Sequence, residues 1–293
     1  MDMVAAIRLV RPRQWTKNLI VFTALIFAGE LLDPRRALTA LGAFVALNLV
    51  SGGLYALNDA RDAERDREHP IKCDRPVAAG RVSAAQAYAL GGVMVAAGLA
   101  LAAPLGTGFL SAVAGYVALQ FLYGVGLKNI AIVDILVIAL GFVLRAVAGS
   151  LVIDLPVSPW LVLCAGLLAL FLATAKRRHE LLLLRERSGD HRPVLREYSA
   201  ELLDSFMVTL SAATITSYAL YTFFEQRTPG YSMMLTIPFV IYGVLRYQSL
   251  VLIGGHGGRP EEILLSDRPI LAAVVLWTLA AIVALYALPA MGT

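Results

Sequence analysis

The chain has 293 residues, of which 58% are hydrophobic and only 16% are charged, and its mean hydropathy is +0.71. A soluble domain averages about 45–50% apolar and about 25% charged residues, so this composition excludes a water-soluble fold. The net charge of +4 does not indicate a nucleic-acid partner, because cations in a membrane protein first report its topology. The two cysteines, Cys73 and Cys164, are too few for a disulfide framework or a metal site.

Long apolar runs recur along the whole sequence and end at charged residues or at Gly and Pro. A membrane-spanning helix needs about 20 mostly apolar residues, whereas a closed β-barrel would show alternating segments of about ten residues. The unbroken run from Leu161 to Ala175 favours helices. We therefore predict an all-α, polytopic integral membrane protein with one domain over residues 1–293 and nine spans, at 17–32, 36–57, 86–103, 107–123, 130–152, 159–175, 203–224, 232–252 and 269–289.

The loops between these spans differ in length and charge. The long, basic loops follow the second, sixth and eighth spans, and the other side of the membrane receives short loops. Of the 25 Lys and Arg residues, only Arg35, Arg36 and Arg227 fall on the short-loop side, and Arg145 falls within the fifth span. Lys and Arg accumulate on the cytoplasmic side of a membrane. The pattern predicts a cytoplasmic N-terminus, an external C-terminus and a functional site formed by cytoplasmic loops.

The first span is preceded by a basic segment, Arg11-Pro12-Arg13-Gln14-Trp15-Thr16-Lys17-Asn18. On an α-helix Arg13 and Lys17 are four residues apart and share one face. They can serve as anchors whose charged ends reach the membrane surface, with Trp15 as an interfacial residue. The functional alternative is that Arg13 and Lys17 reach the phosphate groups of a substrate.

The densest polar signal follows the second span, in Asn58-Asp59-Ala60-Arg61-Asp62-Ala63-Glu64-Arg65-Asp66. Asp59, Asp62 and Asp66 are spaced i, i+3 and i+7, which places three carboxylates on one helical face. Like charges on one face repel each other, so a solvated surface helix would more often place a cation four residues from each acid. Mg²⁺ binds through carboxylates together with substrate phosphates. The pattern predicts a Mg²⁺ site, and the alternative is an ordinary charged helix end.

The same residues resemble a motif of a known family. Asn58-Asp59-x-x-Asp62-x-x-x-Asp66, followed by a basic loop with Asp74-Arg75-Pro76, resembles the first aspartate-rich motif of the UbiA superfamily of intramembrane prenyltransferases. The resemblance extends over essentially the whole chain and implies a bundle of nine transmembrane helices. It also implies that Asp59, Asp62 and Asp66 hold Mg²⁺ against a diphosphate donor. Beside them, we expect substrate contacts from Asn58, Lys72 and Arg75.

Polar residues around the fourth and fifth spans are further candidates. Tyr123 and Lys128 flank the turn between these spans, near where the superfamily places groups that contact the diphosphate. Asp134 and Arg145 lie within the fifth span, where an ionisable group is costly and is by default paired or functional. They are too far apart on one helix to pair with each other, at about 16 Å, so each is expected to meet another span. Asp134 is the better candidate for substrate binding.

The sequence departs from the usual superfamily pattern after the sixth span. Most members carry a second acidic motif there, whereas this chain has Thr174-Ala175-Lys176-Arg177-Arg178-His179-Glu180. Lys and Arg complement phosphate oxygens, and Arg does so with two parallel hydrogen bonds. The change favours a substrate richer in phosphate than a prenyl diphosphate, with Lys176, Arg177 and Glu180 as candidate binding residues. The alternative is that these cations only flank a membrane span.

One branch of the superfamily is more similar to this chain than the rest. The basic stretch after the sixth span, the segment Arg11–Asn18 and Glu261-Glu262-Ile263-Leu264-Leu265-Ser266-Asp267-Arg268-Pro269 resemble the decaprenyl-phosphate phosphoribosyltransferase branch. The resemblance implies a bacterial plasma-membrane enzyme of cell-wall arabinan synthesis. Its implied substrates are phosphoribosyl pyrophosphate and a polyprenyl (decaprenyl) phosphate, its implied cofactor is Mg²⁺, and membrane lipid surrounds it. A homo-oligomer is left open.

Two other functions stay open at this point. A member of the same superfamily could transfer a prenyl group from a prenyl diphosphate to an aromatic or other acceptor, although the missing second acidic motif argues against it. A lipid transporter or flippase would show polar residues at mid-membrane on several spans. Here most charges gather at one side of the membrane, which favours a transferase.

Overall fold

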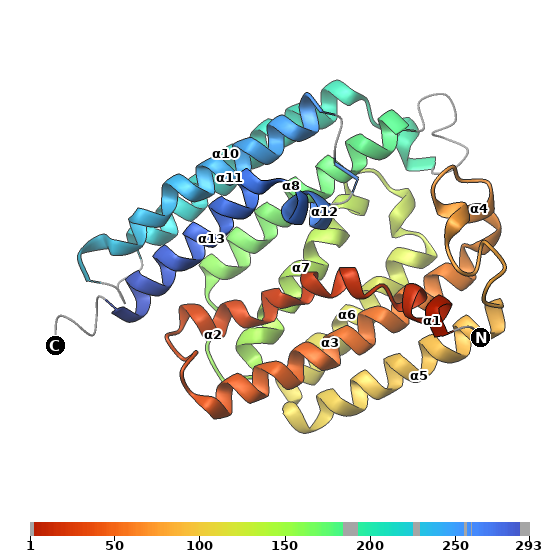
Figure 1. Ribbon diagram of the computed structural model, residues 1–293, viewed down its shortest axis with the longest axis horizontal. Coiled ribbons are helices and arrows are strands. Elements are labelled where there is room, and N and C mark those ends of the chain that lie inside the picture. The colour runs from red at the N-terminus through yellow and green to blue at the C-terminus, as the bar shows by residue number, and fades with distance from the viewer. Residues whose placement is uncertain (1–2, 184–192, 225–228, 255–256, 259, 288–293) are drawn as a thin grey trace. The chain divides into compact units, whose positions relative to one another are not determined.

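The computed structural model describes residues 3–183, 193–224, 229–254, 257–258 and 260–287, and every regular element among them is helical (Figure 1). Arg227 and residues 288–293, on which the topology prediction partly rests, lie outside this range. The elements are α1 (Met3–Val10), η1 (Pro12–Phe22), α2 (Thr23–Phe27), α3 (Pro34–Arg61), α4 (Ala63–Arg67), η2 (Lys72–Asp74), α5 (Ala84–Ala102), η3 (Ala103–Leu105), α6 (Thr107–Val125), η4 (Leu127–Asn129), α7 (Val133–Leu151), α8 (Pro159–Leu183), η5 (Pro193–Glu197), α10 (Ala200–Phe224), η6 (Pro229–Thr236), α11 (Ile237–Leu252), α12 (Pro260–Ser266), α13 (Arg268–Ile282) and η7 (Val283–Ala287).

The chain is a multi-pass membrane protein. Eight stretches of helix in the described residues are long and apolar enough to cross a bilayer, and they match the second to ninth predicted spans. The eight are Pro34–Arg61, Ala84–Leu105, Thr107–Val125, Val133–Leu151, Pro159–Leu183, Ala200–Phe224, Tyr231–Leu252 and Arg268–Ala287.

The first predicted span, 17–32, has a different local structure from the other eight. Its residues 17–22 lie in η1, an 11-residue 3₁₀ helix that passes directly into the short helix α2. A 3₁₀ helix rises about 2.0 Å per residue, against about 1.5 Å in an α-helix, and runs of more than 3–4 residues are uncommon. The two elements together rise about 30 Å, close to the thickness of the hydrocarbon core. The first predicted span, and with it the count of nine spans, therefore stays a prediction.

Several helices begin at residues that satisfy their first backbone N–H groups. The Asp33 carboxylate accepts hydrogen bonds from the backbone N–H groups of Arg35 and Arg36 at the start of α3. At the start of α5, Ser83 and Gln86 form a reciprocal capping box. Such caps contribute about 1 kcal/mol each, and here they fix where two of the long helices start.

The chain divides into two compact units. Unit 1 comprises Met1–Leu25, Leu32–Lys128 and Leu144–Pro156, and unit 2 comprises Ile26–Leu31, Asn129–Val143 and Val157–Thr293. Whether these two units act as the single domain predicted over residues 1–293 is not tested by this division, so the single domain stays a prediction.

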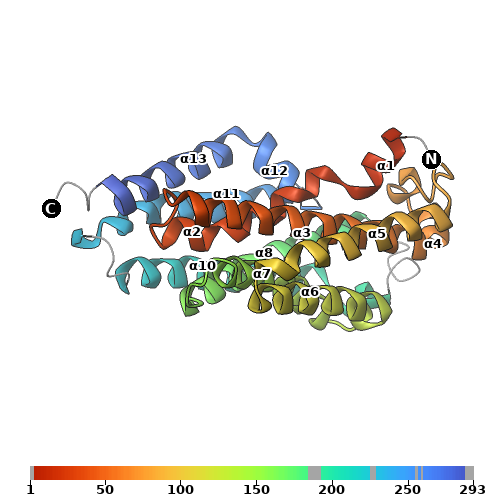
Figure 2. The ribbon, with the colours of Figure 1, turned by 90° about the horizontal axis from the view of Figure 1, so that it is seen from below.

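In unit 1, α3 and α5 lie side by side along their length (Figures 1 and 2). Glycines make this close approach feasible. A Cβ on Gly91 would lie 2.8 Å from the carbonyl oxygen of Gly53, and a Cβ on Gly98 would lie 2.9 Å from the carbonyl oxygen of Ala46. These positions therefore admit no side chain without moving the helices apart.

Neighbouring glycines of α5 provide a direct test of this packing. We expect Gly91→Ala to lower the free energy of unfolding by about 1–3 kcal/mol, because the added methyl group overpacks the α3–α5 contact. Nothing lies within 4 Å of a Cβ built on Gly92, so Gly92→Ala should be neutral or slightly stabilising. Unfolding of both variants in the same detergent measures the difference. Equal stabilities would contradict the close α3–α5 contact.

Unit 1 also buries polar side chains along its helices. The Arg145 guanidinium on α7 donates a hydrogen bond of 2.5 Å to the Tyr116 hydroxyl on α6 and lies 4.3 Å from the centre of its ring. The prediction that Arg145 meets another span is thereby confirmed. Asn18 of η1 donates to Asn48 Oδ1 at 2.6 Å and to Ser51 Oγ at 3.0 Å on α3. These bonds hold η1 along α3.

Unit 2 packs α8, α10, α11 and α13 around an apolar core. Phe171 of α8, Met207 of α10 and Tyr247 of α11 belong to one buried cluster. Elsewhere in unit 2, the Tyr218 hydroxyl accepts a hydrogen bond of 2.7 Å from Trp277 Nε1 and lies 2.7 Å from Thr236 Oγ1. The core holds α8 in place, and α8 carries the basic stretch of the sequence.

Candidate active site

The predicted acidic motif lies at the end of α3 and in α4, within unit 1. The helix α3 ends at Arg61, the backbone of Asp62 has φ −92° and ψ 8°, and α4 begins at Ala63. Backbone hydrogen bonds of 2.9 Å, from Asp62 to Asn58 and from Asp66 to Asp62, keep the chain turning across this interruption. The motif is therefore nearly helical, with a break at its middle carboxylate.

Asp59 and Asp66 bind the same cation. Arg75 Nη1 lies 3.1 Å from Asp59 Oδ1 and 2.7 Å from Asp66 Oδ2. Arg11 also donates to Asp59 Oδ1, and its guanidinium lies 4.9 Å from the centre of the Tyr55 ring. The carboxylates are almost completely buried, whereas the arginines are about one quarter exposed. This arrangement agrees with a shared helical face for Asp59 and Asp66.

Asp62 faces a different cation. Lys128 Nζ, in η4, lies 3.2 Å from Asp62 Oδ1 and 3.4 Å from Oδ2. Burial lowers the pKa of the Lys128 amine below its ordinary value, and the neighbouring Asp62 opposes this shift. Arg61 donates to Asn58 Oδ1 at 2.7 Å and occupies the space beside Gly124 of α6, where a Cβ would collide with its guanidinium.

The carboxylates of the acidic motif have the chemistry of ligands for a divalent cation, but in this structure they are paired with cations. A cation lies against each carboxylate of the motif, and among the described residues no three His, Cys, Asp or Glu side chains converge as a metal site. Asp59 Oδ2, however, is buried and accepts no hydrogen bond from the part of the chain that the structure describes. An unmet buried acceptor costs about 1–3 kcal/mol, and carboxylate oxygens are the ligands that Mg²⁺ prefers. Asp59, Asp62 and Asp66 are therefore suitable residues for holding Mg²⁺.

The N-terminal segment differs from the α-helix that we predicted. In the 3₁₀ helix η1, residues three apart lie on one face, so Arg13 and Lys17 point in different directions and Trp15 aligns with Asn18. Arg13 is exposed and Lys17 is half-buried. Sequence reasoning missed Arg11, which pairs with Asp59. The following proline was the available signal, since the residue before a proline is biased away from helical conformation.

The remaining predicted residues of unit 1 lie around the same loops. Lys72 is half-buried in η2, the short turn that precedes Arg75, and Tyr123 is half-buried near the end of α6. Both belong to segments that flank the acidic motif or Lys128. Their role in substrate binding stays a proposal.

In unit 2, the predicted residues Asp134, Arg177 and Glu180 form a buried network. Arg177 Nε lies 2.8 Å from Asp134 Oδ2, and Arg177 Nη1 pairs with Glu180. The side chains of Asp134 and Arg177 are completely buried. The prediction that Asp134 meets another span is confirmed, because Arg177 belongs to α8. Lys176, the preceding residue, is half-buried.

Sequence reasoning also missed Tyr198, which follows η5. Its hydroxyl donates to Asp134 Oδ1 at 2.7 Å and accepts from the backbone N–H of Ile132 at 2.6 Å. Burial raises the pKa of Tyr198, and the hydrogen bond to Asp134 adds to the rise, so the phenol stays protonated as a donor. Ile132 has a positive φ of 68°. Tyr198 therefore fixes both the carboxylate and the strained turn before α7.

The second arginine of the basic stretch has its own partners. Arg178 pairs with Asp204 of α10 and donates to the backbone carbonyl of Val251 on α11 at 3.0 Å. Both contacts join α8 to neighbouring helices. Arg178 is therefore a packing residue of unit 2.

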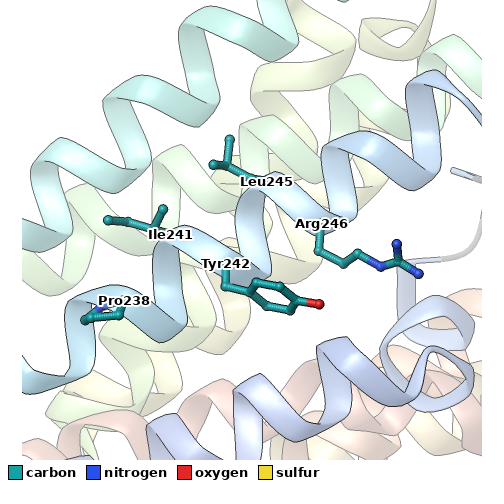
Figure 3. A pocket seen from close by; sticks show the side chains of 5 residues that line it. All are labelled: Pro238, Ile241, Tyr242, Leu245 and Arg246. Carbon is teal, nitrogen blue, oxygen red and sulfur yellow. The ribbon is translucent and has the colours of Figure 1, made fainter.

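The α11 surface holds a shallow groove. Figure 3 shows the side chains that line it, which are Pro238, Ile241, Tyr242, Leu245 and Arg246. Arg246 Nη2 lies 2.9 Å from Oδ2 of Asp267, and Asp267 is the residue that caps the start of α13. The hydrogen bond from Arg246 holds the pKa of Asp267 below its ordinary value. Because Asp267 neutralises Arg246, the groove is a largely apolar surface.

Known proteins share both the sequence and the fold of this chain. Residues 18–192 match the UbiA prenyltransferase family. The chain is 37% identical over 286 residues to a decaprenyl-phosphate phosphoribosyltransferase of Mycolicibacterium smegmatis, covering 92% of this chain and 89% of that protein. A protein of the same description from Corynebacterium glutamicum is 34% identical, with 97% and 87% covered.

A solved structure has the same fold. The UbiA homologue from Archaeoglobus fulgidus bound to GPP and Mg²⁺ superimposes with a TM-score of 0.73 at 21% identity, over 96% of this chain and 99% of that one. The agreement covers the helices that carry both the acidic motif and the basic stretch. The chain belongs to the UbiA prenyltransferase family.

Proposed function

We propose that this protein transfers the 5-phosphoribosyl group of phosphoribosyl pyrophosphate to a polyprenyl (decaprenyl) phosphate in a Mg²⁺-dependent reaction that releases pyrophosphate. The observation that carries the proposal is the buried pair Asp59 and Asp66 with Arg11 and Arg75 around it. Carboxylates suit a metal and guanidinium groups suit phosphate oxygens. The relatives described as decaprenyl-phosphate phosphoribosyltransferases support the same reaction.

The residues of unit 1 have distinct roles in this proposal. Asp59, Asp62 and Asp66 hold Mg²⁺, which when bound neutralises charge on the leaving pyrophosphate. Arg75 and Lys128, released from these carboxylates, bind phosphate oxygens. The other substrate contacts that we propose in unit 1 are Arg13, Lys17, Asn58, Lys72 and Tyr123.

In unit 2 we assign different roles to the predicted residues according to how deeply they are buried. Lys176 is half-buried and is the member that we propose to bind a substrate phosphate. Asp134 and Glu180 neutralise Arg177. For these three residues we propose positioning roles in substrate binding, through the helix α8 that also carries Lys176.

The proposed reaction exchanges one bond at the anomeric carbon of the ribose. The bond from C1 to the pyrophosphate oxygen breaks, and both electrons leave with pyrophosphate. A phosphate oxygen of the acceptor attacks from the opposite face, forms the new C1–O bond and inverts the carbon. No general base is needed, because a phosphate monoester is already an anion near pH 7. Catalysis then rests on positioning and on electrostatic stabilisation.

We also propose a bacterial plasma-membrane location with a cytoplasmic N-terminus and an external C-terminus. The concentration of Lys and Arg in the loops after the second, sixth and eighth predicted spans supports this orientation. The acidic motif then lies on the cytoplasmic side, together with a soluble donor. The product would serve cell-wall arabinan synthesis, and a homo-oligomer stays open.

Prenyl transfer is the second candidate. It is favoured by the fold shared with a UbiA homologue whose bound ligands are GPP and Mg²⁺. An identity of 21% shows the fold alone, so the relatives at 37% and 34% identity that are described as decaprenyl-phosphate phosphoribosyltransferases weigh more in the choice of donor.

A transfer assay with two donors tests the proposal. Purified protein in detergent receives radiolabelled phosphoribosyl pyrophosphate or radiolabelled geranyl diphosphate, each with decaprenyl phosphate, and geranyl diphosphate also with an aromatic acceptor. We expect labelled lipid only from phosphoribosyl pyrophosphate, and only with Mg²⁺. Transfer from geranyl diphosphate alone would establish the second candidate, and transfer from neither donor by folded protein would contradict both.

A further inference from the structure

Arg11 has an unusual backbone and an unassigned side chain. It has φ 52° and ψ 65°, in the left-handed region, and it immediately precedes the 3₁₀ helix η1. Residues other than Gly, Asn and Asp rarely adopt this conformation, and such outliers concentrate at functional sites. Glycine would adopt the same conformation without strain, but arginine adds a side chain that pairs with Asp59.

The guanidinium of Arg11 is one of two partly exposed partners of a buried acid. Asp59 is 1% exposed and the Arg11 side chain is 26% exposed. Two arginines, Arg11 and Arg75, both contact Asp59 Oδ1, while Asp59 Oδ2 is buried and accepts no hydrogen bond from any described residue. The two guanidinium groups repel each other at one oxygen. A metal ion that binds Asp59 Oδ1 would therefore compete with both of them.

The charges of this cluster change in a defined way when a metal binds. Asp59, Asp66, Arg11 and Arg75 together carry no net charge. A divalent cation on the carboxylates leaves the cluster with two excess positive charges, which a pyrophosphate group can neutralise. The Arg11 guanidinium also lies 4.9 Å from the centre of the Tyr55 ring, so Asp59 is not its only partner.

We propose that Arg11 exchanges partners during donor binding: it pairs with Asp59 in the metal-free protein and binds pyrophosphate oxygens of the donor once the metal occupies Asp59. This inference rests on the proposed function for the identity of the donor. Arg11 is then a competitor of the metal and a ligand of the pyrophosphate. A purely structural ion pair would have neither effect.

Binding measurements on an Arg11→Gln variant test this exchange. Mg²⁺ alone is titrated into purified protein in detergent by calorimetry, and inorganic pyrophosphate is then titrated at saturating Mg²⁺. We expect Mg²⁺ to bind about three- to tenfold more tightly, because a competing cation is gone. Pyrophosphate should bind about 10- to 100-fold more weakly, because two charge-assisted hydrogen bonds are lost.

Two further variants complete the experiment. Arg8→Gln removes the same charge from an exposed position on α1 and should match the original protein in both titrations. Arg11→Lys keeps the charge but lacks the forked donors, so Mg²⁺ binding should be unchanged and pyrophosphate binding several-fold weaker. If Arg11→Gln fails to fold, the titrations of Arg11→Lys test the exchange of partners instead.

The two titrations separate this inference from the proposed function. Pyrophosphate is common to phosphoribosyl pyrophosphate and prenyl diphosphates, so failure of the proposed donor in the transfer assay leaves the binding results intact. Opposite shifts in Mg²⁺ and pyrophosphate affinity for Arg11→Gln would support the exchange, as would the selective pyrophosphate loss for Arg11→Lys. Shifts in the same direction, or unchanged pyrophosphate affinity in the folded variants, would overturn it.

Discussion

Replacing Asp59 with Asn is expected to lower the Mg²⁺-dependent transfer rate by about 100- to 1000-fold, the usual cost of removing one group that stabilises transition-state charge. The amide keeps the shape of the side chain but removes a negative charge and one acceptor oxygen. Asp59 is the most buried carboxylate of the motif, and among the described residues its Oδ2 has no hydrogen-bond donor. The initial rate of label transfer to decaprenyl phosphate, measured at saturating Mg²⁺, gives the effect.

The variant should remain folded, so that the loss can be assigned to chemistry. Arg11 and Arg75 are about one quarter exposed, and Arg75 keeps Asp66 as a partner. Water rehydrates such cations, and the loss of stability should stay near 1 kcal/mol. Asp74→Asn is the matched control, because Asp74 is an exposed carboxylate of the same loop. A rate for Asp59→Asn within tenfold of this control would exclude Asp59 as a metal ligand.

The helices of this protein could largely be predicted from apolar periodicity. Runs of apolar residues are a property of composition, and a lipid environment requires that they form helices. The first span was predicted with the wrong local structure because nothing in its composition separates an α-helix from a 3₁₀ helix. The 3₁₀ form of η1 is held by tertiary contacts such as those of Asn18 with Asn48 and Ser51.

The types of residue at the candidate site could be predicted from the sequence. Which cation contacts which carboxylate could be predicted less well. The spacing of Asp59 and Asp66 placed them on one face, and both contact Arg75. The partners Arg11 and Lys128 come from segments distant in sequence. Which cation meets which acid depends on tertiary packing, and the same holds for the contact of Tyr198 with Asp134. Motif spacing along the chain carries no such information.

Replacing Arg177 with Met is expected to lower the free energy of unfolding by about 3–5 kcal/mol, because it leaves buried carboxylates without their cation. Asp134 is completely buried and the Glu180 side chain is 13% exposed. Unfolding in a detergent titration measures the change. Adding Asp134→Asn to Arg177→Met should recover a large part of the loss, since removing both charges avoids an uncompensated one.

The adjacent arginine provides the matched comparison. Arg178→Met also removes a guanidinium from α8, but its partner Asp204 is 37% exposed and can be hydrated. That variant should lose only about 1 kcal/mol.

The comparison decides between two roles for the basic stretch of α8. A large, rescuable loss of stability for Arg177→Met would make Arg177 the residue that holds α8 against α7. Unchanged stability with a raised KM for phosphoribosyl pyrophosphate would instead make it a direct phosphate ligand, and the buried network with Asp134 would then be a property of the substrate-free protein alone.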